Sequence, residues 1–197
     1  MNTPNKLTVL RICLVPFMVV ALLLNFPHHY LVAGLLFGAA SLTDYFDGKI
    51  ARQQNLITDF GKFADPLADK ILVISVFVCF VFLKLCDPVL VIIVLFREFM
   101  VTSIRLVAAA NGTVIAANLW GKVKTVTQMI ALISVFVFQY FLELCALNII
   151  PIPEAVLTPL SFWLLIAGEV LMWISGIFAI VSGIIYMKDN RKCIKDM

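Results

Sequence analysis

Residues 41–70 read SLTDYFDGKIARQQNLITDFGKFADPLADK, and this polar stretch joins two long apolar segments. It contains two pairs of aspartates, Asp44 with Asp47 and Asp65 with Asp69, spaced three and four residues apart. Both spacings place the paired carboxylates on one face of a helix. Each flanking apolar segment has the roughly 20 residues that a helix needs to cross a bilayer. The stretch therefore predicts two antiparallel membrane helices that present four carboxylates near their connection.

The composition extends this prediction to the whole chain. Of the 197 residues, 62% are hydrophobic and only 14% are charged, and the mean hydropathy is +1.05. Soluble domains do not have such a composition. Apolar segments long enough to cross the membrane lie at 7–26, 30–52, 66–86, 88–110, 120–147 and 160–187. We therefore expect an all-α integral membrane fold with six transmembrane helices, formed by one domain over residues 1–197.

Basic residues predict the orientation of the helices, because short loops rich in Lys and Arg stay in the cytoplasm. They cluster at the two chain ends and around the second and fourth connections, as Lys6, Arg11, Lys49, Arg52, Lys62, Lys70, Arg105, Lys122, Lys124, Lys188, Arg191, Lys192 and Lys195. Both termini are thus expected in the cytoplasm. These loops account for the net charge of +3, which favours anionic lipid headgroups and does not indicate nucleic acid. His28 and His29 fall in an outer loop, where we expect them to be solvated.

The four carboxylates predict a metal site. We expect the second helix to end near Arg52 and the third to begin near Pro66, with Gly61 in the connection. Four converging carboxylates repel one another unless cations neutralise them. All-oxygen ligands favour Mg²⁺ or Mn²⁺, and two such ions suit displacement at phosphorus. The chemistry indicated is phosphoryl or phosphatidyl transfer, with Gly48 and Gly61 leaving room for a substrate and Arg52 offering donors to phosphate.

Two other interpretations use the same residues. The aspartates can cap helices and pair with the neighbouring Lys49, Arg52, Lys62 and Lys70 at a wet interface. They can also line the path of a divalent-cation transporter, since intramembrane carboxylates mark ion pathways. The clustering of the aspartates at one membrane face argues against transport, because an alternating-access site lies near the midplane.

The motif resembles the signature of the CDP-alcohol phosphatidyltransferase family, D-x2-D-G-x2-A-R-x8-G-x3-D-x3-D. Every position is met, by Asp44, Asp47, Gly48, Ala51, Arg52, Gly61, Asp65 and Asp69. The resemblance implies six transmembrane helices, a homodimer, and a CDP-lipid bound at the cytoplasmic helix ends. It also implies two divalent ions held by the four aspartates, with Asp69 as general base for the acceptor hydroxyl.

The N-terminal residues PNKLTVLR, 4–11, resemble the entry of that family's first helix, where Asn and Thr side chains hold the nucleotide. Asn5 and Thr8 are the matching residues, and their spacing lets them share a helix face. The alternative is that Asn5 or Thr8 only caps the helix, while Arg11 extends to the lipid headgroups.

A second polar set predicts the acceptor alcohol. Arg97 and Arg105 are eight residues apart, about two helical turns, so they share a face. Lys122 and Lys124 are two apart and point to different sides of a helix. Such cations suit a phosphorylated acceptor, although Arg97 and Glu98 can alternatively form a purely structural ion pair.

The segments FREFMVTSIR (96–105) and GKVKTVTQM (121–129) also resemble those of bacterial phosphatidylglycerophosphate synthases, a branch of the family. This implies CDP-diacylglycerol and sn-glycerol 3-phosphate as substrates. If the acceptor is not glycerol 3-phosphate, inositol phosphate is the next candidate, followed by phosphatidylglycerol.

Overall fold

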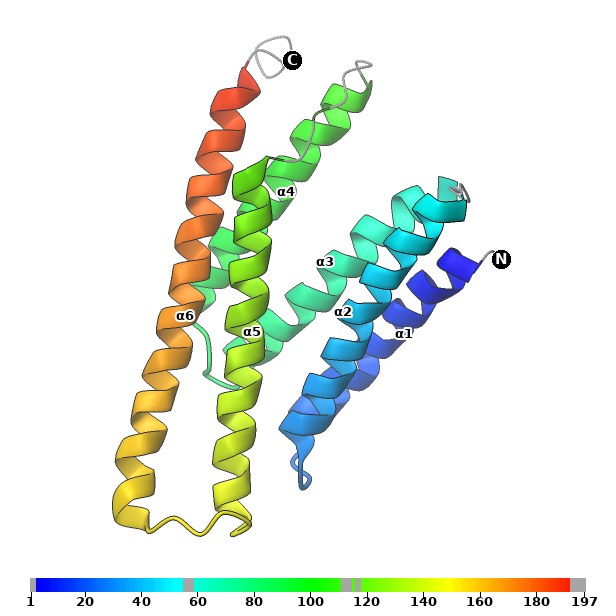
Figure 1. Ribbon diagram of the computed structural model, residues 1–197. Coiled ribbons are helices and arrows are strands. Elements are labelled where there is room, and N and C mark those ends of the chain that lie inside the picture. The colour runs from blue at the N-terminus through cyan, green and yellow to red at the C-terminus, as the bar shows by residue number, and fades with distance from the viewer. Residues whose placement is uncertain (1–2, 55–58, 111–114, 116–117, 192–197) are drawn as a thin grey trace. The chain divides into compact units, whose positions relative to one another are not determined.

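The computed structural model describes residues 3–54, 59–110, 115 and 118–191, with side chains for 7–43, 64, 67–109, 115 and 118–191. These residues form six helices and no strand (Figure 1). The helices are α1 (Thr3–Leu23), α2 (His29–Gln54), α3 (Asp59–Phe82), α4 (Pro88–Ala110), α5 (Leu119–Ala146) and α6 (Glu154–Asp189). The predicted all-α class is confirmed. The chain divides into two compact units, to each of which α5 and α6 contribute residues.

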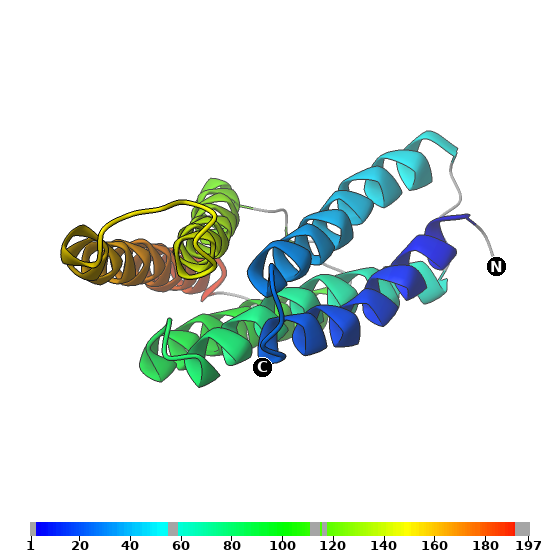
Figure 2. The same ribbon diagram turned by 90° about the horizontal axis from the view of Figure 1, so that it is seen from below.

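Unit 1 consists of residues Met1–Leu83 and Phe136–Ser161. Within it, α1 lies against both α2 and α3 (Figures 1 and 2). Phe136, at the start of the α5 segment in this unit, packs on an aromatic side chain from each of two other helices. Its ring centroid lies 5.7 Å from that of Phe37 in α2 and 5.1 Å from that of Phe80 in α3. All three rings are buried, so Phe136 ties α5 to the three-helix core.

The connection between α1 and α2 is tied to the end of α5. One oxygen of the Glu143 carboxylate accepts the backbone N–H of His29 at 3.0 Å and lies 3.0 Å from its ring Nδ1, and the other accepts the N–H of Tyr30 at 3.3 Å. His28, which adopts a φ of 65°, has its Nδ1 3.3 Å from the Tyr140 hydroxyl. Glu143 thus satisfies N–H groups that a helix start leaves without partners. The prediction that both histidines are solvated is wrong, because both are partly buried.

Unit 2 consists of residues Lys84–Val135 and Phe162–Met197. The two helices that begin in this unit, α4 and α5, each have a capping side chain. The Asp87 carboxylate accepts the Val89 N–H at 2.8 Å, and Pro88 takes the first helical position of α4, where its missing N–H costs nothing. Asn118 accepts the Trp120 N–H at 3.4 Å at the start of α5. The C-terminal end of α4, the start of α5 and the end of α6 lie at the same end of this unit (Figure 1).

Two helices begin earlier than predicted, because each continues through a proline that was predicted to lie at or before its start. α3 begins at Asp59, not near Pro66, so Gly61 lies in the first turn of α3 and not in the connection. α6 begins at Glu154 and contains Pro159. Proline is tolerated inside membrane helices, where other groups satisfy the freed carbonyl. The remaining helix ends lie within four residues of those predicted.

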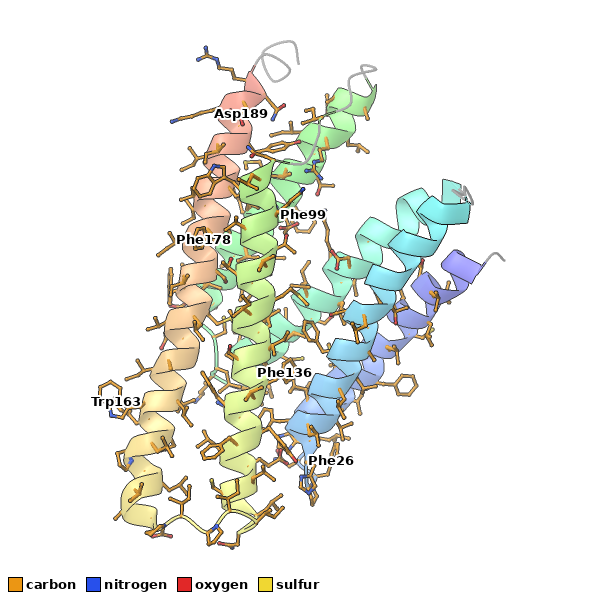
Figure 3. The ribbon with its side chains drawn as sticks, viewed as in Figure 1. Phe26, Phe99, Phe136, Trp163, Phe178 and Asp189 are labelled. Atoms are coloured by element: carbon orange, nitrogen blue, oxygen red, sulfur yellow. The ribbon has the colours of Figure 1, made fainter. Side chains whose placement is uncertain are left out.

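The surface of the helices is apolar. Large hydrophobic side chains are exposed on all six helices, and Trp163 projects away from α6 (Figure 3). α5 and α6 are each long and apolar enough to cross a membrane, and shorter apolar helical segments occur at Leu7–Leu23 and His29–Thr43. Apolar side chains on the outside of a helical protein fit a hydrocarbon solvent.

Four of the five cysteines have described positions. Cys13, Cys79, Cys86 and Cys145 are free thiols, and Cys193 lies outside the described residues. In the connection between α3 and α4, burial, together with the nearby carboxylates of Asp87 and Glu169, raises the pKa of the Cys86 thiol from 9.0 to about 12.

Candidate functional site

The four aspartates lie on two consecutive helices of unit 1. Asp44 is ten residues before the end of α2, and Asp69 is ten residues after the start of α3, which is about 15 Å along each helix axis. Asp47 and Asp65 lie seven and six residues from the same helix ends. Because α2 and α3 contact each other and their connected ends lie together (Figure 1), the two pairs occupy similar levels. Of the four side chains, only that of Asp69 is described, and it is exposed.

The other signature residues lie along the same helix ends. Gly48, Ala51 and Arg52 are in the last turns of α2, and Gly61 is in the first turn of α3. Their side chains, where they have them, lie outside the described part of the chain, as does that of Asn5 in α1. The start of α1 lies at this end of unit 1 as well (Figure 1).

Two polar residues of α1 are fully buried. Thr8 and Arg11 each have 0% of their surface exposed. They are three residues apart and therefore share a helix face. Thr8 is the sixth residue of α1, beyond the first turn, so it is not a helix cap. Arg11 does not extend to lipid headgroups, since its side chain is enclosed by protein.

Within unit 2, a carboxylate joins two cations from different helices. Glu98 Oε1 accepts Arg97 Nη1 at 2.9 Å on α4 and also pairs with the ammonium of Lys124 on α5. The exposed fractions of the side chains are 11% for Arg97, 19% for Glu98 and 5% for Lys124. These three side chains carry two positive charges and one negative charge, largely out of solvent. This arrangement suits an anion more than a neutral alcohol.

The side chain of Arg97 is held by residues that the sequence analysis did not single out. Its Nη2 donates to Ser182 Oγ of α6 at 2.7 Å. A Cβ added at Gly183 would lie 3.3 Å from Arg97 Cγ, and one added at Gly121 would lie 3.3 Å from Arg97 Nη2. The available signal was the repeated Ser-Gly dipeptide in α6, which recurs after two helical turns at 175–176 and 182–183.

The other two predicted acceptor residues differ in their surroundings. Arg105 Nε donates to the Tyr186 hydroxyl at 3.2 Å, and its guanidinium carbon lies 5.5 Å from the centre of that ring. Lys122 is exposed, whereas Lys124 is buried. As predicted, the two lysines point to different sides of α5. Arg97, Arg105 and both lysines all belong to unit 2.

Metal-ligating side chains do not gather elsewhere in the described part of the chain. Among the side chains with described positions, no three from His, Cys, Asp and Glu lie close enough to hold an ion. Three of the four signature aspartates fall outside that set. The donor chemistry of the aspartates, four carboxylates at similar levels on two neighbouring helices, fits hard divalent cations.

The helices of the described part and their apolar surface are those of a membrane protein. More specifically, the chain belongs to the CDP-alcohol phosphatidyltransferase family, whose profile matches residues 1–181. Members of this family generally use divalent metal ions.

Curated relatives match the chain over nearly its whole length. A CDP-diacylglycerol–glycerol-3-phosphate 3-phosphatidyltransferase of Bacillus subtilis is 36% identical, covering 98% of this chain and 97% of its own. One of the same name from Rickettsia bellii is 36% identical, covering 97% and 96%. A probable phosphatidylglycerophosphate synthase of Mycobacterium tuberculosis is 34% identical, covering 94% of this chain and 80% of its own.

Proposed function

We propose that this chain transfers the phosphatidyl group of CDP-diacylglycerol to sn-glycerol 3-phosphate, giving phosphatidylglycerophosphate and CMP. An acceptor hydroxyl attacks the phosphorus that carries diacylglycerol, and the bond from that phosphorus to CMP breaks. The observation that carries the proposal is the similarity, over nearly the full length, to relatives named for this reaction. The two largely buried cations Arg97 and Lys124 support a phosphorylated acceptor.

The aspartates have the metal-binding role in this proposal. Asp44, Asp47, Asp65 and Asp69 would hold two Mg²⁺ or Mn²⁺ ions. Bound there, the ions would supply positive charge that stabilises the attacking and leaving oxygens. Asp69 is the general base that accepts the hydroxyl proton, and the exposure of its side chain gives an incoming substrate access to it.

The CDP-lipid is assigned to the helix ends of unit 1. Gly48 and Gly61 lack side chains that would obstruct a base or a diphosphate close to the backbone, and Ala51 adds little bulk. Arg52 offers paired donors to phosphate oxygens. We further assign Asn5 and Thr8 of α1 to the nucleotide.

The acceptor phosphate is assigned to Arg97, Arg105, Lys122 and Lys124. The burial of Arg97 and Lys124 strengthens their electrostatic attraction to a nearby phosphate, since screening by water is reduced. Exposed Lys122 would attract the acceptor from solution more than bind it tightly.

The proposal includes a topology and an assembly. Six helices would cross the bacterial cytoplasmic membrane, with both termini and the active site on the cytoplasmic side, in a homodimer. The position of the basic residues supports this orientation. Addition of a membrane-impermeant thiol or amine reagent to oriented vesicles would locate the termini.

The decisive experiment measures CMP release by the purified chain with Mg²⁺ and CDP-diacylglycerol. Release only in the presence of sn-glycerol 3-phosphate is the expected result. Parallel reactions with inositol phosphate, and with phosphatidylglycerol, test the other acceptors. Release with inositol phosphate but not with glycerol 3-phosphate would overturn the proposed acceptor while keeping the family chemistry.

A further inference from the structure

The same dipeptide occupies two successive positions on one face of α6. Ser175-Gly176 and Ser182-Gly183 are seven residues apart, and all four residues are buried. The first dipeptide faces an apolar neighbour, because a Cβ at Gly176 would lie 3.3 Å from Leu90 Cγ. Both therefore permit α6 to approach α4 closely, which small residues commonly do in membrane proteins.

The first serine has a purely local partner. Ser175 Oγ donates to the carbonyl of Met172 in its own helix at 2.7 Å. Nothing in this bond connects it to another helix. Ser175-Gly176 thus serves as an internal reference for what a Ser-Gly dipeptide contributes to packing alone.

The second dipeptide faces a cation. Ser182 Oγ accepts Arg97 Nη2 at 2.7 Å, and Gly183 leaves the space into which the Arg97 stem fits. Arg97 Nη1 is bound to Glu98 Oε1. Arg97 Nε is buried and has no hydrogen-bond partner among the described residues. The two terminal nitrogens of this guanidinium are therefore fixed, and its Nε–H remains as a buried donor without a partner. An anion could accept a hydrogen bond from it.

We infer that Ser182 and Gly183 are positioning residues, which orient Arg97 so that its guanidinium binds the phosphate of the acceptor. This inference rests on the proposed function. Neither residue donates to the phosphate itself. Ser182 fixes the direction of the guanidinium plane, and Gly183 determines the path of the side chain past α6.

The test compares Ser182→Ala with Ser175→Ala. Loss of a hydrogen bond to a charged group predicts a rise of about tenfold in KM for glycerol 3-phosphate in Ser182→Ala. KM for CDP-diacylglycerol should stay within about twofold of the wild-type value, because the change acts only on the acceptor. Ser175→Ala should leave both constants unchanged. Equal effects of both substitutions on both KM values would reduce Ser182 to a packing residue and overturn the inference.

The glycines provide a second matched pair. In Gly183→Ala the new methyl meets Arg97 Cγ and Met100 Cε, so Arg97 must move, whereas in Gly176→Ala it meets only Leu90. Gly183→Ala should raise the acceptor KM more than Gly176→Ala does at the same loss of thermal stability. If the acceptor KM rises in proportion to the loss of thermal stability in both variants, the positioning role of Gly183 is contradicted.

Coupling to Arg97 distinguishes positioning from a general effect. In an Arg97→Lys background, Ser182→Ala should change the acceptor KM by less than about twofold, since the guanidinium that Ser182 orients is gone. If Ser182→Ala still raises the acceptor KM about tenfold in this background, Ser182 acts through another group.

Binding of inorganic phosphate, measured by calorimetry on the full chain in detergent, makes the inference independent of turnover. Weaker phosphate binding in Ser182→Ala than in Ser175→Ala supports it, and equal binding refutes it. If the wild type binds phosphate through this residue but releases no CMP with glycerol 3-phosphate, the proposed function fails while the anion-binding role of Arg97 stands.

Discussion

Replacing Glu98 by Gln should destabilise unit 2. Glu98 Oε1 is the shared partner of Arg97 Nη1 and of the Lys124 ammonium, whose side chain is only 5% exposed. Removing one member of a buried ion pair costs about 3–5 kcal/mol, because the remaining buried charge loses that partner. Glu98 is 19% exposed and Arg97 keeps its bond to Ser182, so we expect the lower end of that range, about 3 kcal/mol. For a chain of this length, that loss lowers Tm by about 6–12 °C.

The assay is thermal unfolding of the purified chain in one detergent at pH 7, followed by circular dichroism. Lys122→Gln is the matched control, since it removes an exposed charge from the same region and should shift Tm by less than about 2 °C. The double variant Glu98→Gln with Lys124→Met also removes the buried Lys124 charge and should recover at least half of the loss. A Glu98→Gln variant as stable as Lys122→Gln would show that the ion pair contributes nothing, and the argument from burial would fail.

Three further predictions concern other parts of the chain. Asp69→Asn should lower CMP release by about 10²–10⁴-fold without changing Tm, and full activity of this variant would remove the general-base assignment. Phe136→Ala should cost about 3–5 kcal/mol of stability, because it removes the contacts with Phe37 and Phe80 and leaves a cavity. The control Val137→Ala, at an exposed position, should change stability by less than about 0.5 kcal/mol. Equal Tm values for the two variants would refute the packing role of Phe136. The pKa of Cys86 is higher in the folded chain than the ordinary 9.0, so the protonated thiol favours folding, and this contribution is present below pH 9 and lost as the pH rises toward 12. Stability of the wild type should therefore fall more steeply over that pH range than stability of Cys86→Ala.

The helices were largely predictable because membrane helices have a simple requirement. Each needs a long apolar segment, and polar residues such as Asp87 and Asn118 mark where the next one begins. Proline was the source of the errors. Pro66 and Pro159 were expected near helix starts, as they would be in a soluble protein, but both lie inside helices. In an apolar solvent a helix is kept even where one hydrogen bond is missing.

The candidate site was predictable only where its residues are close in sequence. The aspartate pairs follow from spacing within a helix. The partners of Arg97 do not, because Lys124 and Ser182 come from other helices, and no local pattern fixes which faces of three helices meet. The burial of Arg11 was missed for the same reason, since an arginine near a predicted membrane interface is equally compatible with headgroup contact.

The attachment of Glu143 to the start of α2 has a consequence for synthesis of the protein. The carboxylate that binds the N–H groups of His29 and Tyr30 comes from a residue more than 110 positions later in the chain. During synthesis, α2 must therefore form before this carboxylate exists; the His29 N–H then has the Phe26 carbonyl, 3.1 Å away, as a local acceptor, whereas the Tyr30 N–H must bind water. A nascent chain arrested before residue 143 should show faster amide hydrogen exchange at Tyr30 than the finished protein, and the start of α2 acquires its final hydrogen bonds only after α5 is made.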